Sequence, residues 1–446
     1  MQGKNCKVAK FGGTSLCDAA HFKKIKDLSE RFGNEHCIVV SAPGKRNACD
    51  IKVTDMLYRL YDMRLQGKKA EADELKCAVT ERYSDIASEL GIEFSPEKEL
   101  DFAMANVGTD DTSADELVSR GEYLCAKLLA KYLGYTFIDA AELIFFDEYG
   151  VLMMKKTLRA ISKRLRETEK AVIPGFYGTE AATGKIRTFT RGGSDITGAL
   201  IARGVDAKIY ENWTDVSGFY VTDPRLVPEA RKVDKLCFNE LRELSCMGAS
   251  VLHGSTVLPL MGSDISIRVC NTNAPDEKGT LICPAVETKN RIAGIAGKRG
   301  YTIVTIKKLA LGDDGGFARR ALHAFEACSV PVEHMPLSMD NLSVVTFTSS
   351  LNEKKEMLTQ ELTHVLGDIS VEFSDGISLV AAVSSMLGQS ADAVCTLFNA
   401  LAKNHIRIRL IDTGSGSDSV VAGVDDDDFE RAIRAIYSEF EENGYL

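Results

Sequence analysis

Two glycine pairs follow stretches with strand character, and each carries charged residues suited to a phosphate or carboxylate. The first motif is KFGGTS, where Gly12 and Gly13 let backbone N–H groups approach an anion and Lys10 adds a positive charge. The second is RGGSD, which runs from Arg191 to Asp195 and precedes a predicted helix. Either motif alone is more typical of a turn or a capped helix. Two of them in one α/β sheet favour a cleft for an anionic substrate.

A third segment, WTDVSGFYVTDPR at 213–225, combines aromatic rings that could face a base with donors and acceptors for ribose and phosphates. A Walker-type phosphate loop is not expected, because the segment Gly178–Lys185 has one residue too many between its glycines and Ile186 replaces the hydroxyl residue. We expect His253 to have a packing role. The acidic run Asp425–Asp428 precedes a predicted helix, and we expect it to cap that helix.

Strands alternate with helices through the first half of the chain, which predicts a parallel or mixed sheet covered on both faces. The expected strands are 8–11, 37–42, 135–139, 171–176 and 207–213. Helices are expected after Ser15 through Arg31, over 152–166 and after Asp195. A large, mostly helical insertion is expected between Thr54 and Leu133.

A linker is predicted at 284–300, where Pro284 begins a polar, glycine-containing stretch. Two units of βαββαβ type follow it and form an internal repeat. The first has strands at 301–306 and 342–347, a further strand before 342, and helices at 317–327 and 353–366. The second has strands at 377–384, 407–411 and 419–424, a helix ending at Ala402 and a final helix.

Composition narrows the class of protein. The chain has 446 residues, of which 45% are hydrophobic, so two or three domains with sizeable cores are expected. The formal net charge of -10 argues against a nucleic-acid partner. Twelve cysteines occur singly, without zinc-type spacing, and no signal peptide or membrane-spanning stretch is visible. We therefore expect a cytoplasmic protein that binds no membrane.

The motifs KFGGTS, SAPGK…KVTD, DELVSRGE, GFYG, TRGGSD, WTDVSGFYVTDPR and GASVLH occur in this order. In this the chain resembles the aspartate kinases, over nearly its whole length and including a tail similar to their paired ACT domains. The resemblance implies an α/β fold of the amino-acid-kinase type followed by two α+β ACT domains. The implied division is a catalytic domain at 1–284, one ACT domain at 300–370, and a second built from 285–299 and 371–446.

The resemblance also implies roles for individual residues in transferring the γ-phosphate of ATP to the side-chain carboxylate of aspartate. The implied catalytic residues are Lys10 and Asp195. Aspartate would be bound or surrounded by Ser41, Thr54, Glu122, Phe176, Arg191 and Ser194. ATP would be bound by Lys10, Gly12, Gly13, Thr214, Asp215, Tyr220 and Arg225. Mg²⁺ would accompany ATP, and no metal-ligand residue is assigned. Ser250 stands where many family members have a lysine, so one expected ATP contact is missing unless Arg225 or another cation replaces it.

Feedback control by an amino acid is expected in the first ACT unit. The candidate effector residues are Asp314, Phe317, Ala318, Val332, Glu333 and Ser338. The acidic side chains Asp314 and Glu333 favour lysine over threonine, although lysine, threonine or both remain open. A homodimer, or a dimer of dimers, through the ACT domains is implied.

Three rival functions are less well supported. A kinase for glutamate or N-acetylglutamate is disfavoured by SRGE with TRGGSD and a double ACT tail. A silent amino-acid sensor is disfavoured by intact Lys10, Glu122, Arg191 and Asp195. A fused homoserine dehydrogenase is disfavoured by the length of the chain.

Overall fold

The computed structural model describes residues 6–31, 36–105, 107, 114–190, 192–249, 251–286, 291–309, 314–385, 387, 390–413 and 418–446. The chain divides into two compact units. Unit 1 comprises Met1–Phe219, Lys232–Arg242 and Ser250–Val286, and unit 2 comprises Tyr220–Arg231, Glu243–Ala249 and Glu287–Leu446. Within the described ranges, no helix combines the length and apolar character that crossing a membrane requires.

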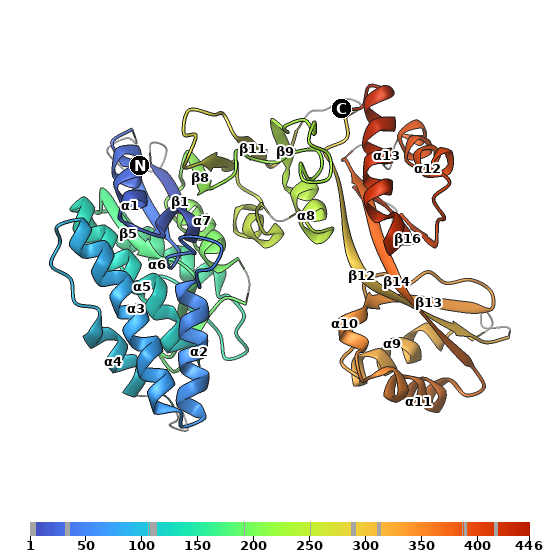
Figure 1. The fold of residues 1–446 in the computed structure, drawn as a ribbon, viewed down its shortest axis with the longest axis horizontal. Coiled ribbons are helices and arrows are strands. Elements are labelled where there is room, and N and C mark those ends of the chain that lie inside the picture. The colour runs from blue at the N-terminus through green and yellow to red at the C-terminus, as the bar shows by residue number, and fades with distance from the viewer. Residues whose placement is uncertain are drawn as a thin grey trace. The chain divides into compact units, whose positions relative to one another are not determined.

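Unit 1 is built on an eight-stranded sheet of order β3-β5-β2-β1-β8-β10-β11-β9 (Figure 1). Its strands are β1 (Lys7–Phe11), β2 (His36–Val40), β3 (Thr136–Phe137), β5 (Lys170–Pro174), β8 (Ile209–Thr214), β9 (Lys235–Cys237), β10 (Ser266–Asn271) and β11 (Thr280–Cys283). All neighbours pair in parallel except β10 with β11. A small second sheet joins β4 (Phe145–Phe146), β6 (Tyr177–Glu180) and β7 (Ile186–Thr188).

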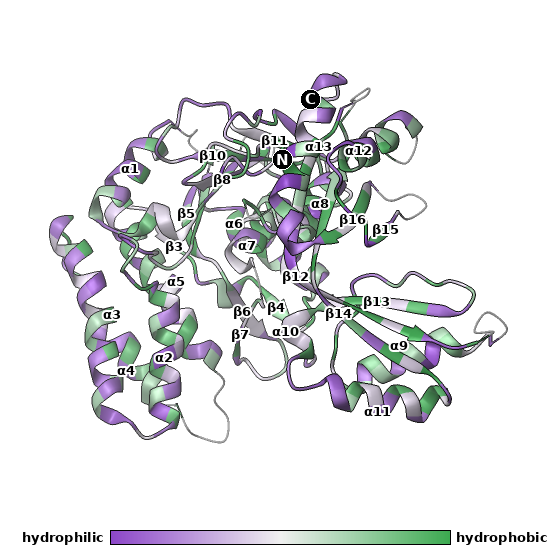
Figure 2. Ribbon diagram, turned by 45° about the vertical axis from the view of Figure 1, so that its right-hand side comes forward, coloured by the Kyte–Doolittle hydropathy of each residue, from purple (hydrophilic) through white to green (hydrophobic). Residues whose placement is uncertain are grey.

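The two faces of the central strands have different partners because successive side chains alternate in direction. Ala9, Phe11, Ile38 and Val40 pack into a core with the helices on one face. These helices are α1 (Ala19–Ser29), α2 (Val53–Leu65), α3 (Lys69–Glu89), α4 (Glu97–Ala105) and α5 (Ala114–Leu133). Lys10 has the opposite parity, and it meets α7 (Gly193–Gly204), which packs beside α6 (Met154–Leu165). In Figure 2 the ribbons of α2 and α3 carry both green hydrophobic and purple hydrophilic stretches, as expected for helices with one buried and one exposed face.

Short helical elements complete unit 1. They are the 3₁₀ helices η2 (Gly13–Leu16), η3 (Ala140–Glu142) and η4 (Gly254–Leu260). The helix α8 (Phe238–Cys246) begins in unit 1 and ends in unit 2.

Unit 2 has one antiparallel sheet of order β13-β12-β14-β16-β15. Its strands are β12 (Gly294–Lys307), β13 (Asn341–Phe347), β14 (Ser370–Val383), β15 (Leu410–Asp412) and β16 (Ser419–Asp425). Its helices are α9 (Phe317–Ala327), α10 (Thr348–Leu351), α11 (Lys355–Leu366), α12 (Ala391–Lys403), η7 (Asp426–Asp428) and α13 (Phe429–Glu442). β12 and β14 run through both halves of the repeat, and their pairing shifts register at Lys298/Tyr301. In Figure 1 α9 and α11 lie beside one end of these strands, and α12 and α13 beside the other.

The predicted fold class is confirmed, while several local predictions are wrong. Residues 294–300, expected in a linker, form the first half of β12. The strand expected before 342 is reduced to the isolated bridges His334–Val345 and Leu337–Leu342. The strands expected at 135–139 and 407–411 are observed as the shorter strands β3 (Thr136–Phe137) and β15 (Leu410–Asp412).

The acidic run Asp425–Asp428 makes no side-chain capping bond to η7 or α13. Asp425 instead pairs with Arg409 and Asp428 with Arg431, while Asp426 accepts a hydrogen bond from Ser378. Cationic and hydroxyl neighbours therefore hold these carboxylates, and the expected capping role is not observed.

Candidate active site

Lys10 is the central residue of the candidate site and lies near the end of β1, in the buried part of that strand. Its side chain is 9% exposed, and its Nζ lies 2.6 Å from Oδ1 of Asp195 in the first turn of α7. The same Oδ1 accepts a hydrogen bond of 2.8 Å from Nδ2 of Asn212, the residue that pairs with Lys10 across β1 and β8. Strand register and the start of α7 therefore bring a cation, a carboxylate and an amide together.

The first turn of α7 is fitted closely against the end of β5. Gly192 caps the helix with φ of 61°, which favours glycine. A Cβ on Gly175 would lie 2.6 Å from the Cβ of Ser194, and a Cβ on Gly193 would lie 2.8 Å from the Cα of Phe176. Phe176 itself has φ of 77°, a strained conformation for a bulky residue. These close approaches fix Phe176 and Ser194 beside Asp195.

Glu122, on α5, is a buried carboxyl group with an unused oxygen. Glu122 is 4% exposed, and its Oε2 has no hydrogen-bond partner among the described atoms. Burial raises the pKa of Glu122 to about 8, although backbone N–H groups of Ala42 and Glu122 and the charge of Lys10 act to lower it. An unpaired buried acceptor carries a desolvation cost that a cationic ligand would remove. Glu122 is therefore suited to bind an ammonium group.

The loops that follow β1 and β2 pack against each other through glycine backbone. The N–H of Gly44 donates to the carbonyl oxygen of Gly13 at 2.8 Å, and a Cβ on Gly44 would lie 2.6 Å from the carbonyl carbon of Gly13. The second loop is held from outside by Arg82, which is 4% exposed and donates to the carbonyl of Gly44 and to the carboxylate of Asp50. This contact positions the loop that begins with Ser41.

The predicted aspartate residues Ser41 and Thr54 are both half-buried, at the end of β2 and in the first turn of α2. Gly12, predicted for ATP, donates its N–H to the carbonyl of Trp213 at 3.0 Å. Arg191 and Ser250 lie outside the described residues. The structure describes every other predicted substrate residue of unit 1.

The predicted nucleotide segment is only partly available to a base. Trp213 and Phe219 are buried, and Trp213 stacks on Phe11 with ring centroids 5.9 Å apart. Neither of these two rings is available to a base, because both are buried in the core, and Tyr220 is the aromatic residue of the segment that is assigned to ATP. Thr214 is half-buried, Asp215 is exposed, and the two share a hydrogen bond of 3.2 Å.

Tyr220 and Arg225 belong to unit 2. Tyr220 is half-buried, and the side chain of Arg225 is 83% exposed and paired with Asp223 at 2.6 Å. The hydrogen bonds from Arg225 hold the pKa of Asp223 below its usual value. Arg225 therefore presents a largely solvated cation.

The effector candidates lie in the first half of the unit 2 sheet. Asp314 pairs with Lys308 and Arg320. Burial favours the neutral acid, but the N–H of Gly316 and the side chain of Arg320 lower the pKa of Asp314 below its usual value. Phe317 is buried in the core between α9 and the sheet, and Ala318 beside it is half-buried. The carboxylate of Asp314 thus already has cationic partners.

The remaining effector candidates follow α9. Val332 is half-buried, and Glu333 and Ser338 are exposed. Burial and then the negative charge of Glu333 raise the pKa values of Cys246 and Tyr301, which places Glu333 near α8 and β12. Glu333 therefore has neighbours different from those of Asp314.

Two residues of the site were not anticipated from the sequence. Asn212 holds Asp195, and the hydroxyl of Tyr210 donates to the backbone carbonyl of Asp195 at 3.1 Å. Their spacing of two, with polar atoms inside a buried strand, is the signal that could have identified them. The expected packing role of His253 is wrong, since its exposed ring caps η4 by accepting from the N–H of Ser255 at 3.3 Å.

Comparison with known proteins identifies the family of the chain. The profile of the amino acid kinase family matches residues 5–271, and that of an ACT domain matches residues 380–440. The chain is 31% identical to aspartokinase 3 of Bacillus subtilis, over 97% of this chain and 98% of that one. It is 29% identical to the lysine-sensitive aspartokinase 3 of Escherichia coli, over 97% and 98%.

Solved structures extend the likeness to three dimensions. The aspartate kinase of Clostridium acetobutylicum is 40% identical and superposes with a TM-score of 0.85, covering 97% of this chain and 99% of that one. Aspartokinase III of E. coli, solved with aspartate and ADP, is 26% identical with a TM-score of 0.80, covering 97% and 99%. The chain belongs to the amino acid kinase family and, within it, to the aspartokinases.

Proposed function

We propose that unit 1 transfers the γ-phosphate of ATP to the β-carboxylate of L-aspartate, giving 4-phospho-L-aspartate for lysine, threonine and methionine biosynthesis. The observation that carries this proposal is the meeting of Lys10 and Asp195 near a buried Glu122 with an unused oxygen. A cation for a phosphoryl group and an acceptor for an ammonium group are what this reaction requires. The E. coli relative bound to aspartate and ADP supports the same pair of ligands.

The chemistry needs no general base, because the attacking carboxylate is already ionised at neutral pH. The barrier comes from bringing two anions together and from the charge on the transferring phosphoryl group. Lys10 lowers this barrier by placing a buried ammonium group where that charge develops. Asp195 holds the lysine side chain in position, and Asn212 in turn holds the carboxylate of Asp195.

Mg²⁺ is expected to accompany ATP, as it neutralises phosphate charge when it is bound. The side chain of Asp195 is 18% exposed and offers one carboxylate, which is the usual protein contribution to such an ion. The carboxylate of Asp195 therefore fits the need of Mg²⁺ for one protein ligand.

The two substrates should depend on different residues. Glu122 and Arg191 would pair with the ammonium and carboxylate of aspartate, in a pocket completed by Ser41, Thr54, Phe176 and Ser194. Gly12, Gly13, Thr214, Asp215, Tyr220 and Arg225 would bind ATP. Substitution of Arg191 by alanine should therefore raise KM for aspartate far more than for ATP, and substitution of Tyr220 or Arg225 should do the reverse.

We further propose that unit 2 holds two ACT domains, at 300–370 and at 285–299 with 371–446, and that lysine is the effector. Asp314, Phe317, Ala318, Val332, Glu333 and Ser338 are the proposed effector residues. The lysine sensitivity of the E. coli relative, also solved with lysine and aspartate, supports this choice. None of the twelve cysteines, all of which the structure describes, forms a disulfide, which fits the cytoplasm.

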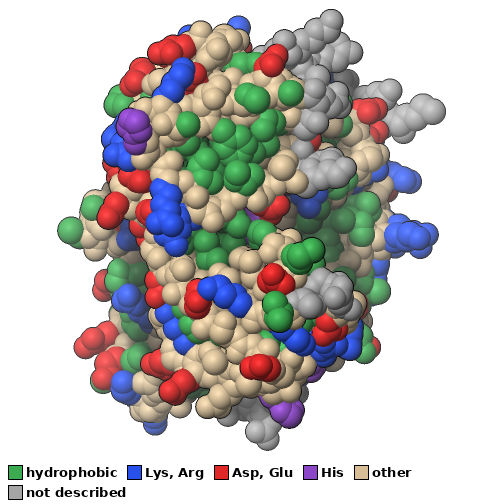
Figure 3. All heavy atoms as spheres, turned by 90° about the vertical axis from the view of Figure 1, so that its right-hand side faces the viewer, with side chains coloured by type: hydrophobic (Ala, Val, Ile, Leu, Met, Phe, Trp, Pro, Cys, Tyr) green, Lys and Arg blue, Asp and Glu red, His purple; other side chains and the backbone are tan. Residues whose placement is uncertain are grey.

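A homodimer or dimer of dimers through the ACT domains is also proposed. Leu309, Leu337, Met339 and Ile411 in unit 2 are 88%, 56%, 78% and 51% exposed. Figure 3 shows hydrophobic side chains gathered into patches on the face that it draws. Exposed apolar patches favour association.

The test is a coupled assay of the purified chain with ATP, Mg²⁺ and aspartate. Hydroxylamine should trap the acyl phosphate as a hydroxamate in amounts that match the ADP formed. Glutamate and N-acetylglutamate are the control acceptors. Faster turnover of either control, or binding of amino acids without any ADP formation, would contradict the proposal.

A further inference from the structure

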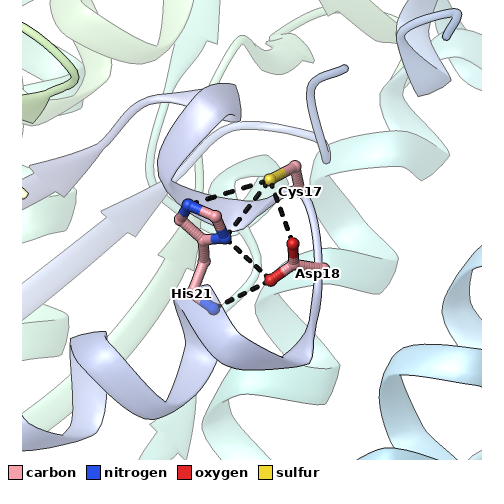
Figure 4. Close-up of side chains that lie close together, drawn as sticks. All are labelled: Cys17, Asp18 and His21. Atoms are coloured by element: carbon pink, nitrogen blue, oxygen red, sulfur yellow. Dashed lines mark hydrogen bonds and ion pairs between the residues drawn. The ribbon is translucent and has the colours of Figure 1, made fainter. Parts of the chain in front are cut away.

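Three side chains of different metal-binding chemistry meet where η2 leads into α1. Cys17, Asp18 and His21 each offer one ligand atom, and these atoms lie within 4.8 Å of one another. Figure 4 shows the thiol, the carboxylate and the imidazole ring turned toward one another. The Sγ of Cys17 lies 3.3 Å from Nδ1 of His21 and 3.7 Å from Oδ2 of Asp18, and Nδ1 lies 2.7 Å from Oδ1 of Asp18.

This spacing is close to that of ligands around a small tetrahedral cation. With metal–sulfur and metal–nitrogen bonds of about 2.3 and 2.0 Å, neighbouring ligand atoms lie about 3.2–3.7 Å apart. The sulfur–nitrogen and sulfur–oxygen separations fall in or at the edge of that range. The sulfur lies near Oδ2 of Asp18 and the nitrogen near Oδ1, so the carboxylate has to turn one oxygen toward the ion and the nitrogen–oxygen hydrogen bond has to lengthen by about half an ångström. Cys17 is the C-cap of η2, Asp18 is the N-cap of α1 and His21 lies in the first turn of α1, so the junction of the two helices brings the three side chains together.

Helix capping accounts for only part of the arrangement. Asp18 caps α1 by accepting from the N–H of His21 at 3.0 Å, and this bond uses only the backbone of His21. It does not require a thiol at position 17 or an imidazole at position 21. The ring and the sulfur lie together in addition to the cap.

The cluster is partly open to solvent. The side chains of His21 and Asp18 are 23% and 40% exposed, so solvent could supply a fourth ligand, while Cys17 is buried. Arg82 lies near enough to act on Cys17, but its charge is already paired with Asp50 at 2.7 Å. Its positive charge is thus largely compensated.

We propose that Cys17, Asp18 and His21 form a binding site for a thiophilic divalent cation, with Zn²⁺ as the probe, distinct from the Mg²⁺ that accompanies ATP. Thiolate and imidazole suit Zn²⁺, whereas Mg²⁺ prefers oxygen ligands and its own water. On binding, the cation takes one sulfur, one nitrogen and one carboxylate oxygen, and the Cys17 thiol releases its proton to solvent. No electron is transferred. The bound ion would fix the start of α1, six residues after Gly13 of the KFGGTS motif.

The test uses the full-length protein, stripped of metal and titrated with Zn²⁺ and Co²⁺ at constant pH. Zn²⁺ competition with a chromophoric chelator gives affinity, and Co²⁺ reports thiolate ligation through its sulfur-to-metal charge-transfer absorption. The wild type should show this absorption at one equivalent. His21→Ala and Cys17→Ala should abolish it and weaken Zn²⁺ binding by at least about 100-fold, more than the loss of an outer-shell partner.

Two further variants separate ligation from folding. Asp18→Asn keeps a good N-cap but removes the charged ligand, so it should weaken Zn²⁺ binding while thermal unfolding of the metal-free protein stays near that of the wild type. Cys77→Ala removes an exposed cysteine elsewhere and should leave the cobalt absorption unchanged. The proposal is overturned if the wild type lacks the absorption, or if Cys17→Ala and His21→Ala retain it.

Discussion

At the scale of single residues, Lys10 has the strongest claim to a role in the chemistry, because its ammonium group is buried and aimed by Asp195. Removing it with Lys10→Ala should lower kcat by on the order of 10²–10³, the usual loss for one such contact to developing charge. Steady-state kinetics at saturating ATP and aspartate measure this. Lys7→Ala, on the same strand with a side chain 34% exposed, is the matched control and should leave kcat unchanged. A normal kcat with a raised KM for ATP would show Lys10 to be a binding residue only.

Glu122 makes a second residue-scale prediction, on stability. Its pKa is raised to about 8 in the folded chain by burial, above the usual value of 4.5. Between these values the folded state holds a proton that the unfolded state has lost, so stability falls as pH rises. Glu122→Gln removes this dependence. Without substrate, the variant's melting temperature relative to wild type should therefore increase from pH 5 to pH 8. A difference that does not change with pH would contradict the assignment.

The same group predicts a pH dependence of substrate affinity. If the substrate's ammonium pairs with ionised Glu122, KM for aspartate should fall as pH rises from 6.5 to 8, because a growing fraction of the protein then holds the charged form. KM for ATP, measured in the same buffers, serves as the control. A KM for aspartate that is constant over this range would contradict the role proposed for Glu122.

The site residues that could be predicted are those that belong to a short sequence motif. Lys10 precedes one glycine pair and Asp195 follows the other, and such local motifs are visible in a sequence. Asn212 and Tyr210 sit inside a run that is otherwise typical of a buried strand, and their role depends on the pairing of β1 with β8. Trp213 is as suitable for a base as for a core, and only its stack on Phe11 decides between them.

At the scale of elements, the contact between the first two loops makes a clear prediction. A Cβ on Gly44 would lie 2.6 Å from the carbonyl carbon of Gly13 and 2.8 Å from its oxygen, both parts of the backbone. Gly44→Ala should therefore displace the loop that follows β1, lower stability by about 1–3 kcal/mol and reduce kcat/KM for both substrates. Thermal unfolding and initial rates measure these effects. Gly315→Ala, where an added Cβ meets nothing within 4 Å, is the control.

The elements themselves were largely predictable, since α9 and most strands of the central sheet follow clear periodicity. The main error concerned 294–300. Gly294, Gly297 and Gly300 give this segment the composition of a linker, yet it pairs with β14 as the first half of β12. A Cβ on Gly297 would lie 2.7 Å from the carbonyl oxygen of Leu379. Close packing thus explains Gly294 and Gly297, and a φ of 87° at the register shift explains Gly300, neither of which composition alone reveals.

At the scale of the whole molecule, the chain joins a kinase unit to a sheet whose two long strands serve both halves of a repeat. β12 and β14 each have 14 residues and pair along most of their length, so a change in one half can reach the other through shared backbone. His334 in the first half also pairs with Asp412 in the second. Such continuity is the kind of connection through which an effector site can bias a two-state equilibrium.

Feedback by lysine is the prediction that tests this arrangement. Glu333 is exposed in unit 2, near Tyr301 and Cys246, and its carboxylate suits the ammonium groups of lysine. Asp314 is a weaker candidate, because Lys308 and Arg320 already pair with it. Glu333→Ala should therefore raise the lysine concentration for half-inhibition by about 10-fold or more, within the 1–3 kcal/mol usual for allosteric coupling. Turnover without lysine should hardly change, since the proposed catalytic residues belong to unit 1.

The control and the decisive measurement use the same assay. Glu326→Ala removes another carboxylate of the first half, whose side chain is 85% exposed, and it should leave lysine inhibition intact. Inhibition curves for lysine, threonine and their mixture depend on both binding and coupling, whereas isothermal titration of lysine measures binding alone. Together the two measurements separate loss of binding from loss of coupling. Equal lysine sensitivity of Glu333→Ala and wild type would move the effector site away from Glu333. If lysine does not inhibit the wild type, with or without threonine, a cationic effector in this unit is excluded, and the acidic side chains of the first half serve the stability of the sheet and its loops.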